Sequence, residues 1–121
     1  YSQVREQFDR PIGSYQAVKH FCANMAIAAQ SAGDLVTFAA VAVDNGRADA
    51  AAQVEAAWIA AAQAALGNAA TNIQIHGGIG FSDEADPHLY IKRARLLVAV
   101  GGGIEAALER IADRGALPVA I

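Results

Sequence analysis

The stretch Gln74-Ile75-His76-Gly77-Gly78-Ile79-Gly80-Phe81 decides how this chain folds. It ends a long alanine-rich segment and begins a glycine-rich turn between two helical patterns. Each glycine inside a helix costs about 1 kcal/mol relative to alanine, so three glycines within four positions predict a break. Glycine also lets the backbone turn sharply or lie close against a flat or anionic group. The rest of the chain is therefore interpreted as a scaffold that places this turn.

Composition favours a small helical domain. The chain has 121 residues, which is enough for one domain with a real core. It is 55% hydrophobic but only 7% aromatic, and its many alanines favour closely packed helices. The net charge of −3 argues against a nucleic-acid-binding surface. The single cysteine, Cys22, excludes an internal disulfide and favours a reducing, cytoplasmic location.

The N-terminal residues, from Tyr1 to about Phe8, have the pattern of the end of a helix. The sequence starts within this pattern and shows neither an initiating methionine nor a signal peptide, so we expect a domain of a longer protein whose first helix is truncated. Pro11 and Gly13 predict a break after it. Ser14 is the predicted N-cap of the next helix.

Two long helices form the predicted centre of the fold. The first runs from Ser14 to Val43, and Cys22 on its broad apolar face is interpreted as a small buried hydrophobic residue. The motif Asp44-Asn45-Gly46 ends this helix through a left-handed cap. The second runs from about Ala48 to Ile75 and is apolar nearly all round in its second half, as expected for a central element. The short loop between the two helices makes them antiparallel neighbours.

Two shorter helices are predicted after the glycine turn. Pro87 suits the first turn of a helix that ends near Arg95, before the apolar run 96–100 and the glycines 101–103. The last helix, from Ile104 to about Arg114, has a predicted buried face made of Ile104, Ala107, Leu108 and Ile111. The tail 115–121 is predicted to be irregular, and no strand is predicted. Residues 1–121 thus form one domain of the all-α class, an up-and-down four-helix-type bundle.

The segment from Ala56 to Ser82 has the length of a membrane span but not its composition. It carries no formal charge and exceeds the roughly 20 residues that a span needs. Gln63, Asn68 and Asn72 interrupt it, however, and its bulk is alanine rather than leucine. Such a segment inserts poorly, so it is interpreted as a buried helix and no membrane span is predicted.

Two clusters are candidates for ligand binding. The glycines of the turn do not form a phosphate-binding loop or a dinucleotide fingerprint, because no lysine follows and no strand precedes them. They either cap a helix or present bare backbone to a ligand. In the second cluster, Arg5 could pair with phosphate, Gln7 could form hydrogen bonds and Phe8 could stack on a flat ring. The alternative is a helix end with a solvated arginine.

The remaining polar residues give weaker signals. The histidines His20, His76 and His88 lack metal-ligand spacing, so no metal site is assigned. The basic cluster Lys92, Arg93 and Arg95 is interpreted as complementing a helix dipole, with a phosphate partner as the alternative.

The clusters, taken in order, carry a resemblance that covers nearly the whole chain. The matching blocks are Tyr1…Arg5-Glu6-Gln7-Phe8-Asp9-Arg10-Pro11-Ile12…Gln16, then Gln74 to Phe81, Glu84, and Lys92-Arg93-Ala94-Arg95. Together they resemble the C-terminal helical domain of the acyl-CoA dehydrogenase family. That resemblance implies a flavoprotein that oxidises an acyl-CoA thioester to its 2,3-enoyl form and passes electrons to an acceptor. It also implies a homo- or hetero-oligomer, a dimer or tetramer, with FAD lying across a subunit interface.

The resemblance also implies which residues contact FAD. Arg5 and Gln7 would contact the pyrophosphate, Phe8 would pack near the adenine, and Gln16 would lie in the same environment. The turn would present an amide and bare backbone to the neighbouring subunit's FAD. The implied cofactor-binding residues are therefore Arg5, Gln7, Phe8, Gln16, Gln74, Gly77 and Gly78.

One departure from the family pattern concerns catalysis. The position of the catalytic glutamate of many family members falls on Gly101, and glycine cannot abstract a proton. Glu105 lies four residues further on and is not assigned the role. Other members place the base on the helix that precedes the equivalent of Tyr1. The family's N-terminal and middle β domains are also missing, so this chain alone is expected to be inactive. The alternatives are a non-catalytic subunit of a hetero-oligomer and a cofactor-free helical interaction module.

Overall fold

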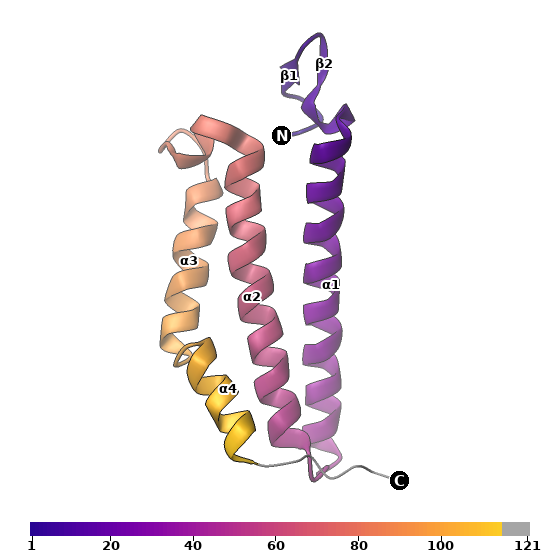
Figure 1. Ribbon diagram of the computed structural model, residues 1–121, viewed down its shortest axis with the longest axis vertical. Coiled ribbons are helices and arrows are strands. Elements are labelled where there is room, and N and C mark those ends of the chain that lie inside the picture. Colours follow the sequence, from indigo (N-terminus) through magenta and orange to yellow (C-terminus); the bar gives the residue numbers. More distant parts are fainter. Residues whose placement is uncertain (115–121) are drawn as a thin grey trace.

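The computed structural model describes residues 1–114 and shows a bundle built on two long antiparallel helices (Figure 1). Its elements are β1 (Glu6–Gln7), β2 (Arg10–Pro11), the 3₁₀ helix η1 (Ile12–Ser14), α1 (Gln16–Asp44), α2 (Ala50–His76), the 3₁₀ helix η2 (Gly77–Phe81), α3 (Pro87–Val100) and α4 (Ile104–Asp113). After η2 the chain turns back, and α3 and α4 follow one another along the other side of α2. The predicted all-α, up-and-down bundle is confirmed. The prediction for 115–121 lies outside the described residues.

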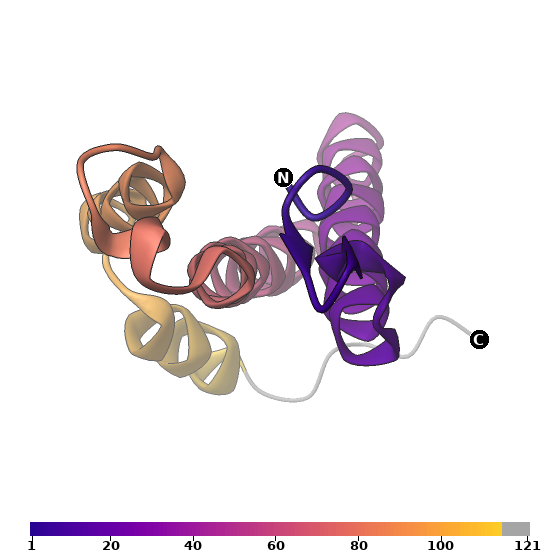
Figure 2. The ribbon, with the colours of Figure 1, turned by 90° about the horizontal axis from the view of Figure 1, so that it is seen from above.

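Helix α2 is the central element, as predicted. It packs against α1 on one side and against α3 and α4 on the other (Figure 2). Its buried residues are mostly alanines, namely Ala52, Ala57, Ala62 and Ala69, with Ile73 near its end. Alanine lets neighbouring helix backbones approach closely, which gives a thin core. None of the large side chains among the described residues is fully buried.

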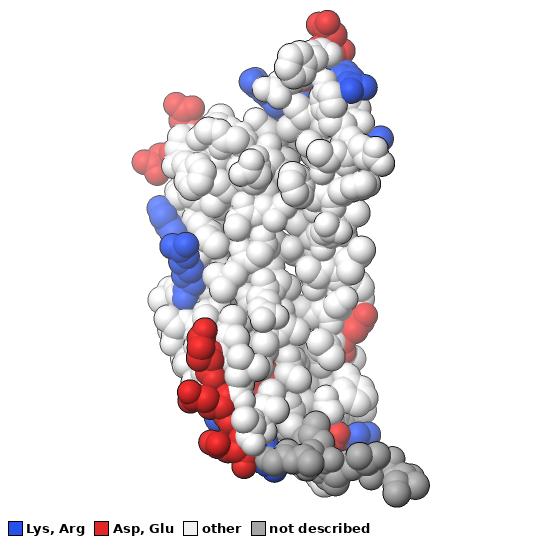
Figure 3. Space-filling model, in the orientation of Figure 1, with Lys and Arg blue, Asp and Glu red and all other residues white. Residues whose placement is uncertain are grey.

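Helix α1 buries little of its apolar surface. Only Ala32, Ala39 and Ala42 are buried along its whole length. Cys22 is exposed, so its assignment to the core is wrong, because the face of α1 that packs on α2 is narrow. The residues that remain largely exposed on α1 and α3 include Ile27, Val36, Phe38, Val41, Val43, Leu89, Tyr90, Leu96, Leu97 and Val100. Figure 3 accordingly shows a broad uncharged face, with charged side chains near its ends and edges.

By length and composition alone, α1 could also cross a membrane. Its mean hydropathy is 1.5 over an 18-residue window in which 17% of the residues are buried. It is the one helix of the described chain that meets this criterion, and it is not the segment from Ala56 to Ser82 that raised the question in the sequence. The polar residues that interrupt α2, and the modest hydropathy of its many alanines, explain why α2 does not meet it.

The N-terminal segment is a hairpin, so the predicted helix end before Phe8 is wrong. Strands β1 and β2 pair antiparallel, with Gln7 opposite Arg10. The two residues between them, Phe8 and Asp9, have φ values of 53° and 61°, the pattern of a type I′ turn. The hairpin is held by contacts further along the chain. The Ile12 N–H donates to the Arg5 carbonyl over 2.8 Å, and Ile12 itself is buried.

Two other helix boundaries and one buried face differ from prediction. Ser14 lies in η1, and the N-cap of α1 is Tyr15, which makes no side-chain capping bond. Helix α3 continues to Val100 instead of ending near Arg95, because the apolar run continues its helical pattern. On α4, Ala107 is fully buried but Leu108 is 51% exposed, so the buried face is centred away from Leu108.

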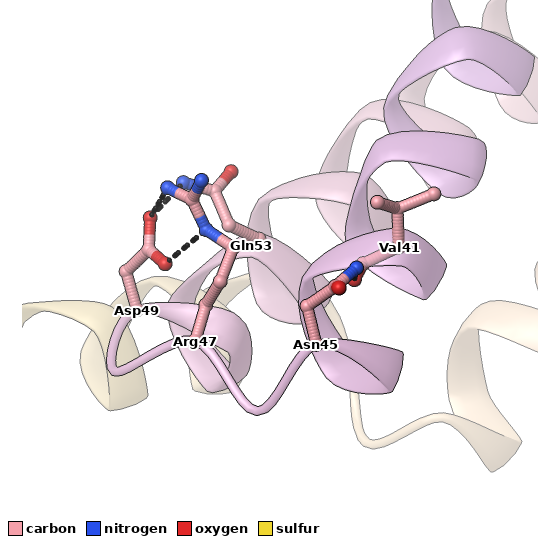
Figure 4. A network of polar contacts seen from close by, with 5 residues as sticks. All are labelled: Val41, Asn45, Arg47, Asp49 and Gln53. Carbon is pink, nitrogen blue, oxygen red and sulfur yellow. Dashed lines mark hydrogen bonds and ion pairs between the residues drawn. The ribbon is translucent and has the colours of Figure 1, made fainter.

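The connection between α1 and α2 has the predicted cap and a polar network (Figure 4). Asn45 is the C-cap of α1, and Gly46 takes the left-handed φ of 60°. Arg47 donates two hydrogen bonds to Asp49, over 2.8 and 2.9 Å, and Gln53 donates a third over 3.0 Å. The hydrogen bonds from Arg47 hold the pKa of the Asp49 carboxyl well below its usual range. The network fixes the reversal between the long helices.

A paired contact attaches α4 to α2. Arg110 Nε and Nη2 donate to the two carboxylate oxygens of Glu55, over 2.7 and 2.8 Å. The hydrogen bond from Arg110 lowers the pKa of Glu55 below its ordinary value of 4.5. The Glu55 carboxylate therefore binds a proton less well in the folded state than in the unfolded state. The stability that the Glu55–Arg110 ion pair contributes is present above pH 4.5 and is lost as the pH falls through the lowered pKa.

We therefore expect the Glu55→Gln variant to unfold at a lower temperature than the wild type at neutral pH, by a small margin suited to a part-exposed ion pair. The difference should shrink as the solution is acidified through the lowered pKa, because the wild type then loses its charge as well. Thermal unfolding of the 1–121 chain across this acid range measures it. The matched control is Glu109→Gln, an exposed glutamate on α4, the helix that carries Arg110. An equal loss at every pH would contradict the role of the ion pair.

Candidate cofactor-binding site

A cavity of about 530 Å³ lies where the N-terminal hairpin meets the C-terminal end of α2. These two segments are far apart in the sequence but lie at the same end of the molecule (Figure 1). The lining residues are Tyr1, Arg5, Gln7, Ile12, Tyr15, Val18, Phe21, Gln74, Ile75, His76, Gly77, Gly78 and Ile79. The two clusters singled out in the sequence therefore form the walls of one cavity.

Five of the seven implied cofactor-binding residues line this cavity, namely Arg5, Gln7, Gln74, Gly77 and Gly78. The structure does not bring the other two to its wall. Phe8 is at the tip of the hairpin and is 88% exposed. Gln16 is the exposed first residue of α1. A role for these two residues stays a prediction.

Arg5 combines a fixed backbone with an unpaired side chain. Its N–H donates to the Tyr1 carbonyl and its own carbonyl accepts from Ile12, both over 2.8 Å. Its exposed guanidinium makes no ion pair with any residue of the described part of the chain. No aspartate or glutamate lines the cavity. The site therefore offers an anion a cation that has no intramolecular competitor.

The structure gives a different answer for each of the three glycines of the turn to the question of why glycine occupies the position. Gly77 is the C-cap of α2 with a φ of 65°, so the capping interpretation holds for this residue. A Cβ on Gly80 would lie 2.8 Å from the Ile73 carbonyl oxygen, which explains a glycine there by close packing. A Cβ on Gly78 would meet nothing within 4 Å, and its φ is not in the left-handed region. Nothing within this domain requires the bare backbone at Gly78, which faces the cavity.

Aromatic contacts that the sequence did not reveal join the two walls. The rings of Tyr1 and His76 stack with their centroids 4.1 Å apart and an interplanar angle of 22°. The Tyr15 hydroxyl donates to the Gln7 carbonyl over 2.9 Å, and Arg10 lies 4.0 Å above the Tyr15 ring. Tyr15 lines the cavity together with Val18 and Phe21 at three-residue steps. That spacing on the first turns of α1 is the one sequence signal that could have indicated them.

Position 101 has no room for a catalytic side chain. Gly101 is the C-cap of α3 with an ordinary φ of −77°. A Cβ placed on it would overlap the Cζ2 and Cη2 atoms of the Trp58 indole and would lie 3.1 Å from Cε2. The sequence has no base at this position, and the structure has no space for one, because a side chain here would point toward Trp58 on α2.

The other charged candidates lie outside the cavity. Lys92, Arg93 and Arg95 are on the exposed surface of α3 but not in its last turn, so they do not complement the C-terminal dipole of this helix. Arg93 lies beside a second, more apolar cavity of about 460 Å³ between α1, α2 and α3. Within residues 1–114, no group of His, Cys, Asp or Glu side chains is arranged to hold a metal ion.

Comparison with known proteins identifies the group that shares this arrangement. Residues 1–116 match the family described as "Acyl-CoA dehydrogenase, C-terminal domain". The acyl-CoA dehydrogenase FadE34 of Mycobacterium tuberculosis is 43% identical over 114 residues, which cover 92% of this chain and 16% of FadE34. The acyl-CoA dehydrogenase IpdE2 of the same organism is 42% identical over 94 residues, 78% of this chain and 28% of IpdE2.

A solved structure resembles this chain in both fold and sequence. A chain of the ChsE4-ChsE5 complex from Mycobacterium tuberculosis superposes with a TM-score of 0.86 and 35% identity, over 99% of this chain and 32% of that one. The chain described here thus spans less than a third of the length of these relatives.

Proposed function

The chain belongs to the acyl-CoA dehydrogenase family as a C-terminal domain, and from this premise we propose that it supplies part of the FAD site and of the oligomer interface of a longer acyl-CoA dehydrogenase. The observation that carries the proposal is the cavity in which Arg5 and Gln7 face Gln74, Gly77 and Gly78. These are a cation, two amide side chains and bare backbone, with no carboxylate. Such a set suits an anionic dinucleotide and lacks a group for proton abstraction.

The residues present fit FAD in three respects. The unpaired Arg5 guanidinium can form a two-pronged contact with the pyrophosphate, and Gln7 and Gln74 can hydrogen-bond to polar edges of the cofactor. The bare backbone at Gly78 leaves space for close approach. Phe8, held at a positive φ and almost fully exposed, would pack near the adenine, and Gln16 would lie close by. When bound, FAD accepts the hydride that leaves the acyl-CoA substrate, while this domain's residues bind and orient it.

The exposed apolar faces of α1 and α3 support an assembled state. Large apolar side chains such as Ile27, Leu96 and Val100 are more than half exposed, and exposed apolar surface of this kind is typical of protein interfaces. We propose that these faces are covered by the remaining domains of the protein or by further subunits of a homo- or hetero-oligomer, a dimer or tetramer. The proposed protein is cytoplasmic and passes its electrons to a separate acceptor.

A second candidate function is a non-catalytic subunit of a hetero-oligomeric acyl-CoA dehydrogenase. The packing of Gly101 against Trp58 favours it, because no base can stand at this position without rearrangement. The intact cavity favours retention of cofactor contacts in either case. The two functions differ in whether the full-length protein oxidises an acyl-CoA without a partner chain. The unpaired Arg5 and the bare Gly78 argue against a third candidate, a helical interaction module without a cofactor.

We expect the purified 1–121 chain to show neither flavin absorbance nor acyl-CoA oxidation, because its cavity is open and supplies only a few of the contacts that FAD needs. The full-length protein, with its partners, should carry flavin that acyl-CoA bleaches under anaerobic conditions. Absorbance spectra of both preparations measure this. Stoichiometric yellow cofactor in the isolated domain would contradict the shared site, and a flavin-free assembled protein would contradict the proposed function itself.

A further inference from the structure

We infer that Trp58 is a positioning residue that closes position 101 to every side chain and fixes the loop Gly101–Gly103. In the reaction proposed above, on which this consequence rests, the proton-abstracting carboxylate then reaches the loop from outside this domain. No motif in the sequence indicates this role for Trp58.

The loop is pinned on both sides, so it cannot easily move away from Trp58. The Gly101 N–H donates to the Leu97 carbonyl over 2.9 Å, and the Gly103 N–H donates to the Val98 carbonyl over 2.9 Å. Trp58 stands on the opposite side, on the central helix α2. A side chain at position 101 would therefore have to displace either the end of α3 or the indole of a core helix.

The indole is held by its shape and not by a polar contact. Trp58 Nε1 is buried and has no hydrogen-bond partner among the described residues. A buried N–H without a partner is unfavourable, so packing of the ring must maintain its position. The surface against which the ring packs includes the bare Cα of Gly101. Trp58 and Gly101 are thus a size-matched pair, a large ring against a residue without a side chain.

The outer side of the same loop is open. Gly102 and Gly103 have φ values of 88° and 86°, which residues with side chains rarely adopt. A Cβ on Gly102 would meet nothing within 4 Å. The loop is therefore closed toward α2 and bare toward the outside, where it leaves room for a group from another segment or subunit.

A double-mutant cycle in the full-length assembled protein tests the pair. Gly101→Ala should lower the thermal midpoint, because the new methyl group overlaps the indole. Trp58→Phe shortens the ring. In that background, Gly101→Ala should lower the thermal midpoint much less than it does in the wild type. Gly67→Ala on α2, where a Cβ meets nothing within 4 Å, is the matched control and should not lower the midpoint. If the changes in thermal midpoint caused by Trp58→Phe and Gly101→Ala were strictly additive in the double variant, the steric pairing would be overturned.

A catalytic readout tests the consequence for the base. Gly101→Glu alone should destabilise the protein and should not increase the turnover of acyl-CoA. Trp58→Phe/Gly101→Glu has room for the carboxylate, yet it should gain no turnover and no new ionisation in the pH profile if the base comes from outside. The inference would be overturned if this double variant showed a several-fold increase in turnover together with a new ionisation on the acidic side of its pH profile. Coupling in the cycle together with an inactive wild type would sink the proposed function and leave the steric pairing standing.

Discussion

Replacing Arg5 with alanine is expected to weaken FAD binding by the full-length assembled protein by about 10- to 100-fold, the effect of losing charge-assisted hydrogen bonds to a pyrophosphate. The guanidinium has no partner within the described residues, so its removal leaves no carboxylate unpaired in this domain. Stability should therefore change little, whereas flavin content should fall. Titration of the apoprotein with FAD, followed by flavin fluorescence, measures the effect.

Two matched variants sharpen the test. Arg5→Lys keeps the charge but loses the two-pronged geometry, so FAD affinity should lie between those of the wild type and the alanine variant. Arg95→Ala removes an exposed arginine of α3 that does not line the cavity, and it should bind FAD as the wild type does. Equal weakening by Arg5→Ala and Arg95→Ala would point to a general charge effect and against a site at Arg5.

The long elements could be predicted from the sequence because local signals agree there. The three- and four-residue spacing of apolar residues indicated both long helices, and Asn45 with Gly46 marked the end of the first. The N-terminal hairpin could not be predicted, because each strand has two residues and no alternation to detect. Its geometry depends on Ile12 and on a bond from the Gly13 N–H to the Ser2 carbonyl, over 2.7 Å. Local patterns do not report such contacts.

Burial was the least predictable feature of the helices. The sequence predicts that the apolar face of α1 belongs to the core, yet Cys22 and Val36 on this face are exposed, since a single domain provides only α2 to pack against it. Hydrophobicity alone cannot distinguish a residue buried in its own domain from one available to other domains. The same limit explains Leu108, whose apolar character predicted burial where Ala107 takes the contact.

The candidate site was predictable in its residues more than in its shape. The sequence indicates both clusters, and the structure brings five of the seven implied cofactor-binding residues together around one cavity. The stacking of Tyr1 on His76, which joins the walls, involves residues far apart in the sequence that no local pattern pairs. The contact of Trp58 with position 101 is of the same kind. Tertiary packing decides both.

Gly80 and Gly78 should respond in opposite ways to the same substitution. Gly80→Ala is expected to destabilise the domain by about 2 kcal/mol, within the range for overpacking of a close contact. The added Cβ would lie 2.8 Å from the Ile73 carbonyl oxygen and 3.1 Å from the His76 Cβ. Both atoms belong to the last turns of α2, which cannot yield without disturbing the helix. Denaturant unfolding of the 1–121 chain measures the loss.

Gly78→Ala should leave stability unchanged or slightly raised, because the new methyl group meets nothing within 4 Å and alanine restricts the unfolded chain more than glycine does. In the full-length protein, however, that methyl group would stand on the cavity wall where the cofactor is proposed to approach. FAD affinity should therefore fall although the fold is intact. Gly80→Ala should lose both stability and affinity, since η2 carries the wall. If Gly78→Ala bound FAD as tightly as the wild type, the bare backbone at this position would not be a cofactor contact, whatever the result at Gly80.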